Sequence, residues 1–229
     1  MSEQTVALLA QNELFAHLDR EALFKLAERA ERRTYKKGEF VFRQGDPGES
    51  LFVLLDGVAK VVVGSEQGDE MVLVTLQASD SFGELAVVDG RPRSASVEVL
   101  EPAIALVIDR KTLVSLVDEH PSVAEGLLRS LGTVLRRLTD QASDFVFLDL
   151  HGRVAKLLIG FAEAHGEATD EGVLLDLHLT QGDLARMVGG SRQRINQILG
   201  SFANRGYLEL RGRQIMLKRL PILRRRAGV

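Results

Sequence analysis

The sequence contains no cysteine and no tryptophan, and only five of its 229 residues are proline. Without cysteine, the chain can form no disulfide and cannot hold an iron–sulfur cluster through thiolates, which excludes redox sensing by either group. The five histidines are dispersed, and none lies between residues 18 and 119, so we expect no metal site there. No apolar run approaches the roughly 18 residues of a membrane span, and the first residues lack the pattern of a signal peptide. We therefore expect a cytoplasmic protein without metal or membrane contact.

Positive charge is concentrated at the C-terminal end of the chain. From residue 180 onward there are eleven lysines and arginines but two acidic residues, whereas the remaining 179 residues carry 18 basic and 30 acidic groups. A strongly basic segment on an acidic body is typical of a protein that binds the phosphate backbone of a nucleic acid. The alternative is a solvated basic tail.

The hydrophobic pattern changes period along the first half of the chain. It predicts helix over residues 6–30. From Thr34 to about Val107, runs of β-branched and aromatic residues are separated by glycines, which is typical of an all-β jelly roll or sandwich. Asp109 can then cap a helix that runs through Val117.

A second, longer helix is predicted after Pro121, which suits a first helical turn. Its apolar residues recur at steps of three and four and could pack against another helix: Leu127, Leu131, Val134, Leu138, Ala142 and Phe145. Roughly 25 helical residues span about 37 Å, which is longer than one small barrel needs. We therefore predict a dimerisation helix, with packing on the chain's own barrel as the alternative.

A short stretch near residue 84 has the residue types of a sugar-phosphate site. Gly83 allows a close backbone approach, and Glu84 can accept hydrogen bonds from vicinal hydroxyls. Arg93 and Ser94 can hold a phosphate through a guanidinium, a hydroxyl and an amide. The alternative is that Glu84 and Arg93 form only an ion pair on the barrel.

The basic segment contains two short helical patterns separated by Gly189-Gly190. Asp149 can cap a helix that precedes them, Thr180 can start the first pattern together with Asp183, and Ser191 can cap the second. In the second pattern, the apolar residues Ile195, Ile198, Leu199 and Phe202 leave four polar residues on another face: Arg192, Gln193, Asn196 and Gln197. This is helix-turn-helix geometry, with polar side chains placed to meet base edges.

Two short segments, 207–210 and 214–217, follow the second helical pattern. Between them lie Arg211, Gly212 and Arg213. This predicts a hairpin wing with a basic tip, whose two arginines are better placed for phosphates than for bases.

Taken together, these segments make the chain resemble, over nearly its full length, the bacterial cyclic AMP receptor (CRP/FNR) family of transcription regulators. The resemblance implies an α+β chain with a cyclic-nucleotide-binding β jelly roll in residues 1–120. It implies a dimerisation helix and hinge in 121–147 and a winged helix-turn-helix domain in 148–229. The implied function is not enzymatic: a homodimer, controlled by cAMP or a related cyclic nucleotide, binds palindromic double-stranded DNA and contacts RNA polymerase.

The resemblance also assigns roles to individual residues. Glu84 corresponds to the ribose ligand, Arg93 and Ser94 correspond to the cyclic-phosphate ligands, and Gly83 and Leu85 line the same loop. In the DNA-binding part, Arg192 corresponds to a guanine-reading arginine and Ser191 to a phosphate contact. The DNA-facing set is completed by Thr180, Gln181, Gln193, Asn196, Gln197, Arg211 and Arg213.

Two departures from the family pattern affect specificity. Leu138 stands where a threonine meets the adenine amino group, and Leu138 cannot hydrogen-bond, although Thr139 follows it. Gln193 and Gln197 replace a glutamate and an arginine, and an amide suits adenine better than cytosine.

Three alternative functions are weighed against this one. The first is a family member that is active without a nucleotide or that answers to another effector, and haem is left open by the composition. The second is an enzyme on a cupin-like barrel, which normally supplies clustered histidines. The third is a regulatory subunit that signals to another protein, against which the basic wing and Arg192 argue.

Overall fold

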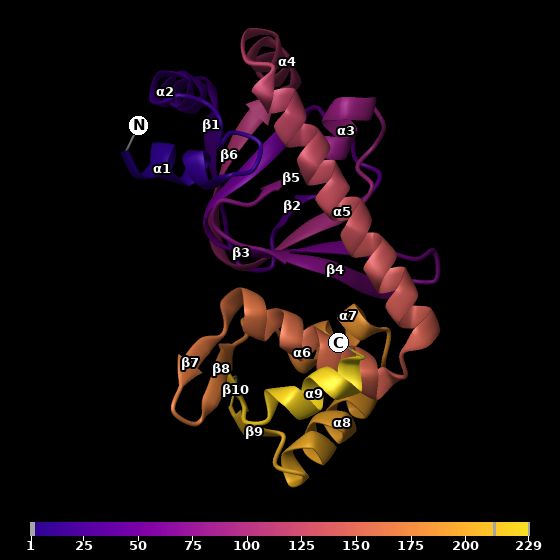
Figure 1. Cartoon of the computed structure of the whole chain (residues 1–229). Helices are drawn as coiled ribbons and strands as arrows, with labels where there is room; N and C mark the ends of the chain where they lie inside the picture. The colour runs from indigo at the N-terminus through magenta and orange to yellow at the C-terminus, as the bar shows by residue number, and fades with distance from the viewer. Residues whose placement is uncertain (1–2, 213, 229) are drawn as a thin grey trace. The chain divides into compact units, whose positions relative to one another are not determined.

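The structure is a computed structural model that describes residues 3–212 and 214–228. The chain forms two compact units, residues 1–137 and residues 138–229. The boundary between them falls inside the long helix α5 (Ser122–Phe147), which Figure 1 shows running out of the first unit.

Two helices open the first unit, α1 (Glu3–Gln11) and α2 (Arg20–Arg29). The prediction of continuous helix over residues 6–30 is therefore wrong between them. The buried Asn12 explains the break, because its side-chain oxygen accepts from the Leu14 amide at 3.0 Å and its side-chain nitrogen donates to the Ser79 carbonyl at 2.6 Å. These bonds compete with the helical ladder and turn the chain. Asp19 caps the restart by accepting from the Ala22 amide.

An antiparallel, rolled six-stranded sheet forms the centre of the first unit, as the glycine-separated runs predicted. Its main path is β1-β6-β3-β4, while β2 pairs with β6 and β5 pairs with β3. The strands are β1 (Glu31–Tyr35), β2 (Phe40–Phe42), β3 (Ser50–Gly64), β4 (Glu70–Leu76), β5 (Ser81–Phe82) and β6 (Ser96–Asp109). The long strands β3 and β6 pair from Ser50–Asp109 to Val62–Ser96, and their register shifts around Gly57. Such irregularities bend strands, which lets this sheet roll up.

Two further helices precede the long helix, α3 (Glu84–Asp89) and α4 (Arg110–Glu119). Asp109 caps α4 as predicted, because its carboxylate accepts from the Thr112 amide at 2.7 Å. In Figure 1, α1, α2 and α4 lie near one another at one end of the rolled sheet. Their apolar faces share one core with strands β3 and β6.

The apolar stripe of α5 divides where the helix leaves its own unit. Leu127 is only 9% exposed and packs into the core of the first unit, whereas the adjacent Leu128 is 69% exposed. Gly126 is also buried, and a Cβ there would lie 2.8 Å from the Leu14 backbone. Leu127 therefore packs on the chain's own barrel, which was the alternative to its packing against a second helix. The stripe available to a second helix begins at Leu128.

Among the residues described, the second unit contains four helices after the end of α5. They are α6 (Leu150–His165), α7 (Gln181–Val188), α8 (Arg192–Asn204) and α9 (Leu220–Ala227). An antiparallel sheet of order β7-β8-β10-β9 lies beside them (Figure 1), made of β7 (Glu167–Thr169), β8 (Gly172–Asp176), β9 (Leu208–Arg211) and β10 (Gln214–Leu217). The predicted wing is the β9–β10 hairpin. Helix α9, which begins with Pro221 in its first turn, was not predicted.

The core of the second unit is built from the apolar faces that the sequence indicated. Ile195, Ile198, Leu199 and Phe202 of α8 are buried, and they pack with residues of α6, α7 and the sheet. Within residues 3–212 and 214–228, no helix is both long and apolar enough to cross a membrane. No group of three metal-ligating side chains occurs in that part of the chain either.

Candidate ligand pocket and DNA-binding surface

The turn between β5 and α3 needs glycine at residue 83. Gly83 has φ +83°, a left-handed conformation that side chains disfavour. A Cβ at this position would also lie 2.7 Å from Nη1 of Arg93. Gly83 therefore allows Arg93 to lie directly against the backbone where α3 begins.

Arg93 is held inside the first unit by two backbone carbonyls. Its Nη1 donates to the Gly83 carbonyl at 2.7 Å, and its Nη2 donates to the Ser50 carbonyl at 2.8 Å. The guanidinium carbon lies 4.2 Å from the ring centroid of Phe42 and 5.5 Å from that of Phe52, within cation–π range. Arg93 is only 5% exposed, and its buried Nε has no hydrogen-bond partner among the residues described.

Glu84 and Arg93 are neighbours without an ion pair. Glu84 is 9% exposed, and the described residues include no carboxylate within ion-pair distance of Arg93. Burial raises the pKa of Glu84, while a hydrogen bond from its own backbone amide and, to a smaller extent, the positive charge of Arg93 oppose that rise. Burial likewise lowers the pKa of Arg93, while Glu84 and Asp46 counteract the change. The alternative prediction, that Glu84 and Arg93 form only an ion pair on the barrel, is therefore wrong.

The loop before β3 completes the surroundings of Arg93. The backbone of Arg93 exchanges two hydrogen bonds with this loop, one from the Gly45 amide at 2.9 Å and one to the Asp46 carbonyl at 2.8 Å. Gly48 lies against Ala86 and the Arg93 side chain, which leaves no room for a Cβ. Phe42 and Ser50 were not among the predicted ligand residues. The glycine-separated pattern of residues 45–57 indicated the strands and turns of a nucleotide-binding jelly roll, but not which of these residues surround Arg93.

The remaining predicted ligand residues are all exposed. Leu85 and Ser94 are exposed beside the buried pair of Glu84 and Arg93. Leu138 and Thr139 lie in α5 within the second unit, and both are exposed. Their contact with a nucleotide stays a prediction.

The end of α5 is attached to the helices of the second unit. The Lys156 ammonium lies 2.6 Å from the Asp144 carboxylate, and the Arg153 guanidinium lies 4.8 Å from the ring centroid of Phe145. That ring also covers Gly189, where an added Cβ would approach it to 2.6 Å. Phe145 therefore joins the end of α5 to the turn before α8.

Helices α7 and α8 form the predicted helix-turn-helix. Thr180 and Asp183 form a capping box at α7, in which the Asp183 amide donates to the Thr180 hydroxyl at 3.1 Å and the Thr180 amide donates to the carboxylate at 3.0 Å. Gly189 ends α7 with φ +66°. Ser191 then caps α8 by accepting from the Arg194 amide at 3.3 Å.

The polar face of α8 is exposed as the apolar pattern predicted. Its exposed residues from the cap onward are Ser191, Arg192, Gln193, Arg194, Asn196 and Gln197. Thr180 is also exposed, whereas Gln181 is partly buried. No carboxylate pairs with Arg192 among the described residues, so its charge is available to an anionic partner.

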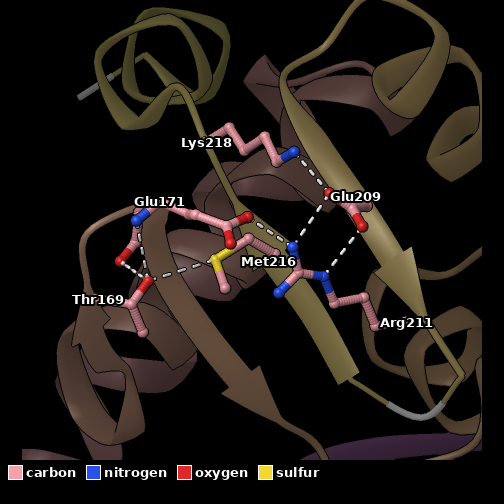
Figure 2. A network of polar contacts seen from close by, with 7 residues as sticks. Thr169, Glu171, Glu209, Arg211, Met216 and Lys218 are labelled. Carbon is pink, nitrogen blue, oxygen red and sulfur yellow. Dashed lines mark hydrogen bonds and ion pairs between the residues drawn. The ribbon is translucent and has the colours of Figure 1, made fainter.

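The wing carries a network of charges around Arg211, which Figure 2 shows from close by. The Arg211 guanidinium donates to Glu209 at 2.9 Å through Nε and to Glu171 at 2.6 Å through Nη2. Lys218 lies 2.5 Å from the same Glu209 carboxylate. Hydrogen bonds from Arg211 and Lys218 lower the pKa of Glu209 to about 2.

The network restricts how Arg211 can contact a phosphate. Two carboxylates already accept from Nε and Nη2, so a phosphate must use Nη1 or displace a carboxylate. The role of Arg211 as a phosphate contact stays a prediction. Arg213 lies outside the described residues.

A rolled sheet followed by a unit with a helix-turn-helix and a wing is the architecture of a transcription regulator. Residues 32–120 match the cyclic nucleotide-binding domain family, and residues 152–226 match the Crp-like helix-turn-helix domain family. The "CRP-like cAMP-activated global transcriptional regulator" of Mycobacterium tuberculosis is 33% identical over 220 residues, which cover 96% of this chain and 98% of the relative. The chain belongs to the CRP/FNR family of cyclic nucleotide-binding transcription regulators.

Other similar proteins extend these comparisons. The "Anaerobic regulatory protein" of Bacillus subtilis is 26% identical over 201 residues, which cover 86% of this chain and 84% of the relative. Among solved structures, a mutant of CooA from Carboxydothermus hydrogenoformans matches with a TM-score of 0.78 and 24% identity, covering 89% of this chain and 90% of the other. The structural match shows that the fold is shared.

Proposed function

We propose that this chain forms a homodimer that binds a cyclic nucleotide beside Glu84 and Arg93 and thereby changes its affinity for palindromic DNA. The observation that carries the proposal is the buried but unpaired state of these two charges. A buried guanidinium and a buried carboxylate each lose hydration, and a direct ion pair does not compensate them here. A cyclic nucleotide compensates both, because its phosphate accepts from Arg93 and its ribose hydroxyl donates to Glu84.

The neighbouring groups support the same ligand. The Nε of Arg93 lacks a hydrogen-bond acceptor among the described residues, and a phosphate oxygen supplies one. The exposed Ser94 hydroxyl adjoins Arg93 and can donate to the same phosphate. The short helix α3 starts at Glu84, so its first amides add donors for an anion.

The base of the nucleotide is proposed to meet Leu138 and Thr139. The Mycobacterium tuberculosis relative is named for activation by cAMP, which supports cAMP as the effector. Leu138 cannot hydrogen-bond to an adenine amino group, so Thr139 of either chain must supply that contact. Discrimination between adenine and guanine then depends on one hydroxyl.

The dimer is proposed to form along α5 from Leu128 onward. Leu128 is exposed, and the exposed apolar residues Leu135, Leu138 and Val146 continue toward the end of the helix. Two such helices can bury these side chains against each other. A nucleotide that touches Leu138 and Thr139 favours one arrangement of the helix pair.

The end of α5 is suited to pass that arrangement to the DNA-binding surface. Phe145 contacts Gly189, two residues before the Ser191 cap of α8, and the Asp144–Lys156 ion pair adds a second attachment. A movement of residues 138–147 therefore moves the recognition helix α8. Two symmetry-related helices must enter major grooves about 34 Å apart, so the affinity for DNA depends on their spacing.

A second candidate function is a regulator that is active without a nucleotide. It is favoured by the hydrogen bonds from Arg93 to the carbonyls of Gly83 and Ser50, which satisfy part of the guanidinium in the absence of any ligand. Leu138, which stands in place of a hydrogen-bonding residue, also favours a regulator that is active without a nucleotide.

Calorimetric titration of the purified protein with cAMP and with cGMP separates the two candidates. We expect cAMP to bind and DNA affinity to change when it does. If neither nucleotide binds at millimolar concentration while operator DNA binds tightly, the nucleotide-controlled function is wrong and the ligand-independent one stands.

A further inference from the structure

The second unit contains a hollow that the proposed function does not use. Its volume is about 270 Å³, and it lies among α6, α8 and α9. Eight residues line it: His151, Ser201, Phe202, Arg205, Tyr207, Ile222, Arg225 and Arg226. Three of the eight are arginines and none is acidic, so the hollow has a strongly positive lining.

The polar groups of this lining lack partners within the described residues. In that part of the chain, neither the guanidinium of Arg205 nor those of Arg225 and Arg226 form an ion pair or a side-chain hydrogen bond. The same holds for the hydroxyls of Ser201 and Tyr207. Three like charges around one hollow repel one another, and an anion between them removes that repulsion.

The adjacent Arg224 has an acidic partner, so the lack of such partners is specific to the arginines that line the hollow. Arg224 precedes Arg225 in α9 but does not line the hollow, and its Nη2 lies 3.0 Å from the Glu163 carboxylate. Helix α9 thus directs one arginine to a carboxylate and leaves the next two without one. A general shortage of acidic residues does not explain this difference.

The apolar part of the lining is aromatic. Phe202 is 2% exposed, and its ring centroid lies 6.2 Å from that of His151 and 6.0 Å from that of Tyr207. Ile222 of α9 adds an aliphatic group. A ligand that fills the hollow must therefore combine negative charge with an apolar, preferably flat, portion.

The hollow lies away from the surface proposed to read DNA bases. Asn196 lies in α8 and Arg205 is the C-cap that directly follows this helix. They are nine positions apart, which at about 100° per helical residue places them on opposite sides of the helix. Ser201 lies in the C-terminal half of α8 and Arg205 at its end, whereas base contacts are made near the start of a recognition helix. This position favours a small ligand over the backbone of the bound duplex.

We propose that this hollow binds a small organic phosphate monoester that carries a flat apolar group. Arg205, Arg225 and Arg226 hold the dianionic phosphate through charge-assisted hydrogen bonds, and Ser201 and Tyr207 can donate to it. The apolar group packs on Phe202 and Ile222. Because the site draws residues from α6, α8 and α9, its occupant joins the three helices. The inference does not depend on nucleotide binding in the first unit.

Titration of the full-length protein with phenyl phosphate, followed by NMR or calorimetry, tests this site. We expect saturable binding, at least tenfold weaker binding of inorganic phosphate, which lacks the ring, and no binding of phenol, which lacks the charge. Arg205→Ala and Arg225→Ala should each weaken phenyl phosphate binding by at least tenfold. The matched control is Arg224→Ala, which removes the same charge from the same helix and should leave the affinity unchanged.

Several outcomes would overturn the proposal. No phenyl phosphate binding at millimolar concentration would do so, and so would equal weakening by Arg224→Ala. A third is loss of DNA affinity in Arg205→Ala without any phenyl phosphate binding by the parent, which would assign the arginines to the duplex instead. Should Arg205→Ala unfold, Ser201→Ala and Tyr207→Phe keep the test decisive, because each removes only a hydroxyl and should weaken binding severalfold.

Discussion

Arg93 donates from Nη1 to the carbonyl of Gly83 at 2.7 Å, so the guanidinium is fixed to the same turn that begins α3. Glu84 follows that turn directly. The orientation of the buried carboxylate and the position of the guanidinium therefore depend on one peptide unit. A ligand that draws Arg93 away from Gly83 must also act on the start of α3.

The first prediction concerns Arg93. Arg93→Leu should remove a charge-assisted contact worth about 2–4 kcal/mol, because the phosphate of a bound nucleotide would lose its cationic partner. Calorimetry should then show cAMP affinity reduced by more than tenfold. Arg91→Leu is the control, since Arg91 is exposed and lies 4.0 Å from Asp89. Equal cAMP affinity in Arg93→Leu and the parent would remove Arg93 from the site.

The second prediction follows from the raised pKa of Glu84. Burial penalises the ionised carboxylate only in the folded state, so the folded protein loses stability as pH rises through the ordinary carboxyl pKa toward the raised value. Glu84→Gln removes this penalty. The variant should therefore melt at a higher temperature than the parent at pH 7, with no such difference near pH 3, where both states of the parent are protonated.

The same variant should bind cAMP more weakly, because an amide replaces the carboxylate that accepts from the ribose hydroxyl. A stabilised variant that binds cAMP normally would separate Glu84 from ligand binding. A variant without the pH-dependent stabilisation would show that burial does not raise the pKa of this carboxyl.

Helix caps and turns could be predicted from the sequence because they depend on few neighbouring residues. The predicted caps are present at three helices, formed by Asp109, Thr180 and Ser191. Each uses a side-chain oxygen to accept an amide within three residues, so the whole interaction is visible in a short window.

Features that depend on distant residues were not predicted. Asn12 interrupts the first helical stretch partly by donating to Ser79, which is 67 residues away. Ser50 holds Arg93 through its carbonyl, which any residue type would supply. The helical pattern also does not show whether Leu127 or its neighbour Leu128 packs on the barrel of the same chain. In each case, tertiary packing chooses among options that the local pattern allows.

The third prediction concerns the dimer. Leu128→Glu should separate the chains, because two carboxylates would enter a desolvated interface. Leu128 is 69% exposed within the chain, so the substitution should leave the fold of each unit unchanged. Sedimentation at micromolar concentration measures the outcome. The control is Val114→Glu, at an exposed position on α4, and this variant protein should remain a dimer. A monomeric parent would contradict the dimer itself.

The fourth prediction concerns the attachment of α5 to the helix-turn-helix. Phe145→Ala removes the ring that covers Gly189 and lies beneath Arg153. We expect unchanged cAMP affinity per site but a reduced effect of cAMP on DNA affinity, since coupling between sites typically amounts to about 1–3 kcal/mol. Fluorescence anisotropy with labelled operator DNA, with and without cAMP, measures it. Phe147→Ala is the control, because Phe147 is 80% exposed. Full coupling in Phe145→Ala would show that the signal does not pass through this ring.

The last prediction concerns base recognition by α8. Arg192 directly follows the Ser191 cap, is exposed, and has no carboxylate partner among the described residues. Its side chain is therefore free to reach a guanine edge, and Arg192→Ala should cost about 1–3 kcal/mol and relax the preference at one position of each half-site. Gln193 and Gln197 should favour adenine at neighbouring positions, because an amide can both donate to and accept from that base.

Selection from random duplexes, repeated with each variant, measures these preferences. Arg213→Ala provides the contrast, since a phosphate contact on the wing should weaken all sequences alike and lower the salt slope by about one unit. Arg224→Ala removes a charge already paired with Glu163 and should leave the selected sequences unchanged. If Arg192→Ala also selects the parent's sequences, α8 does not read the base assigned to it. The basic segment would then have to bind DNA without sequence preference, through its charge alone.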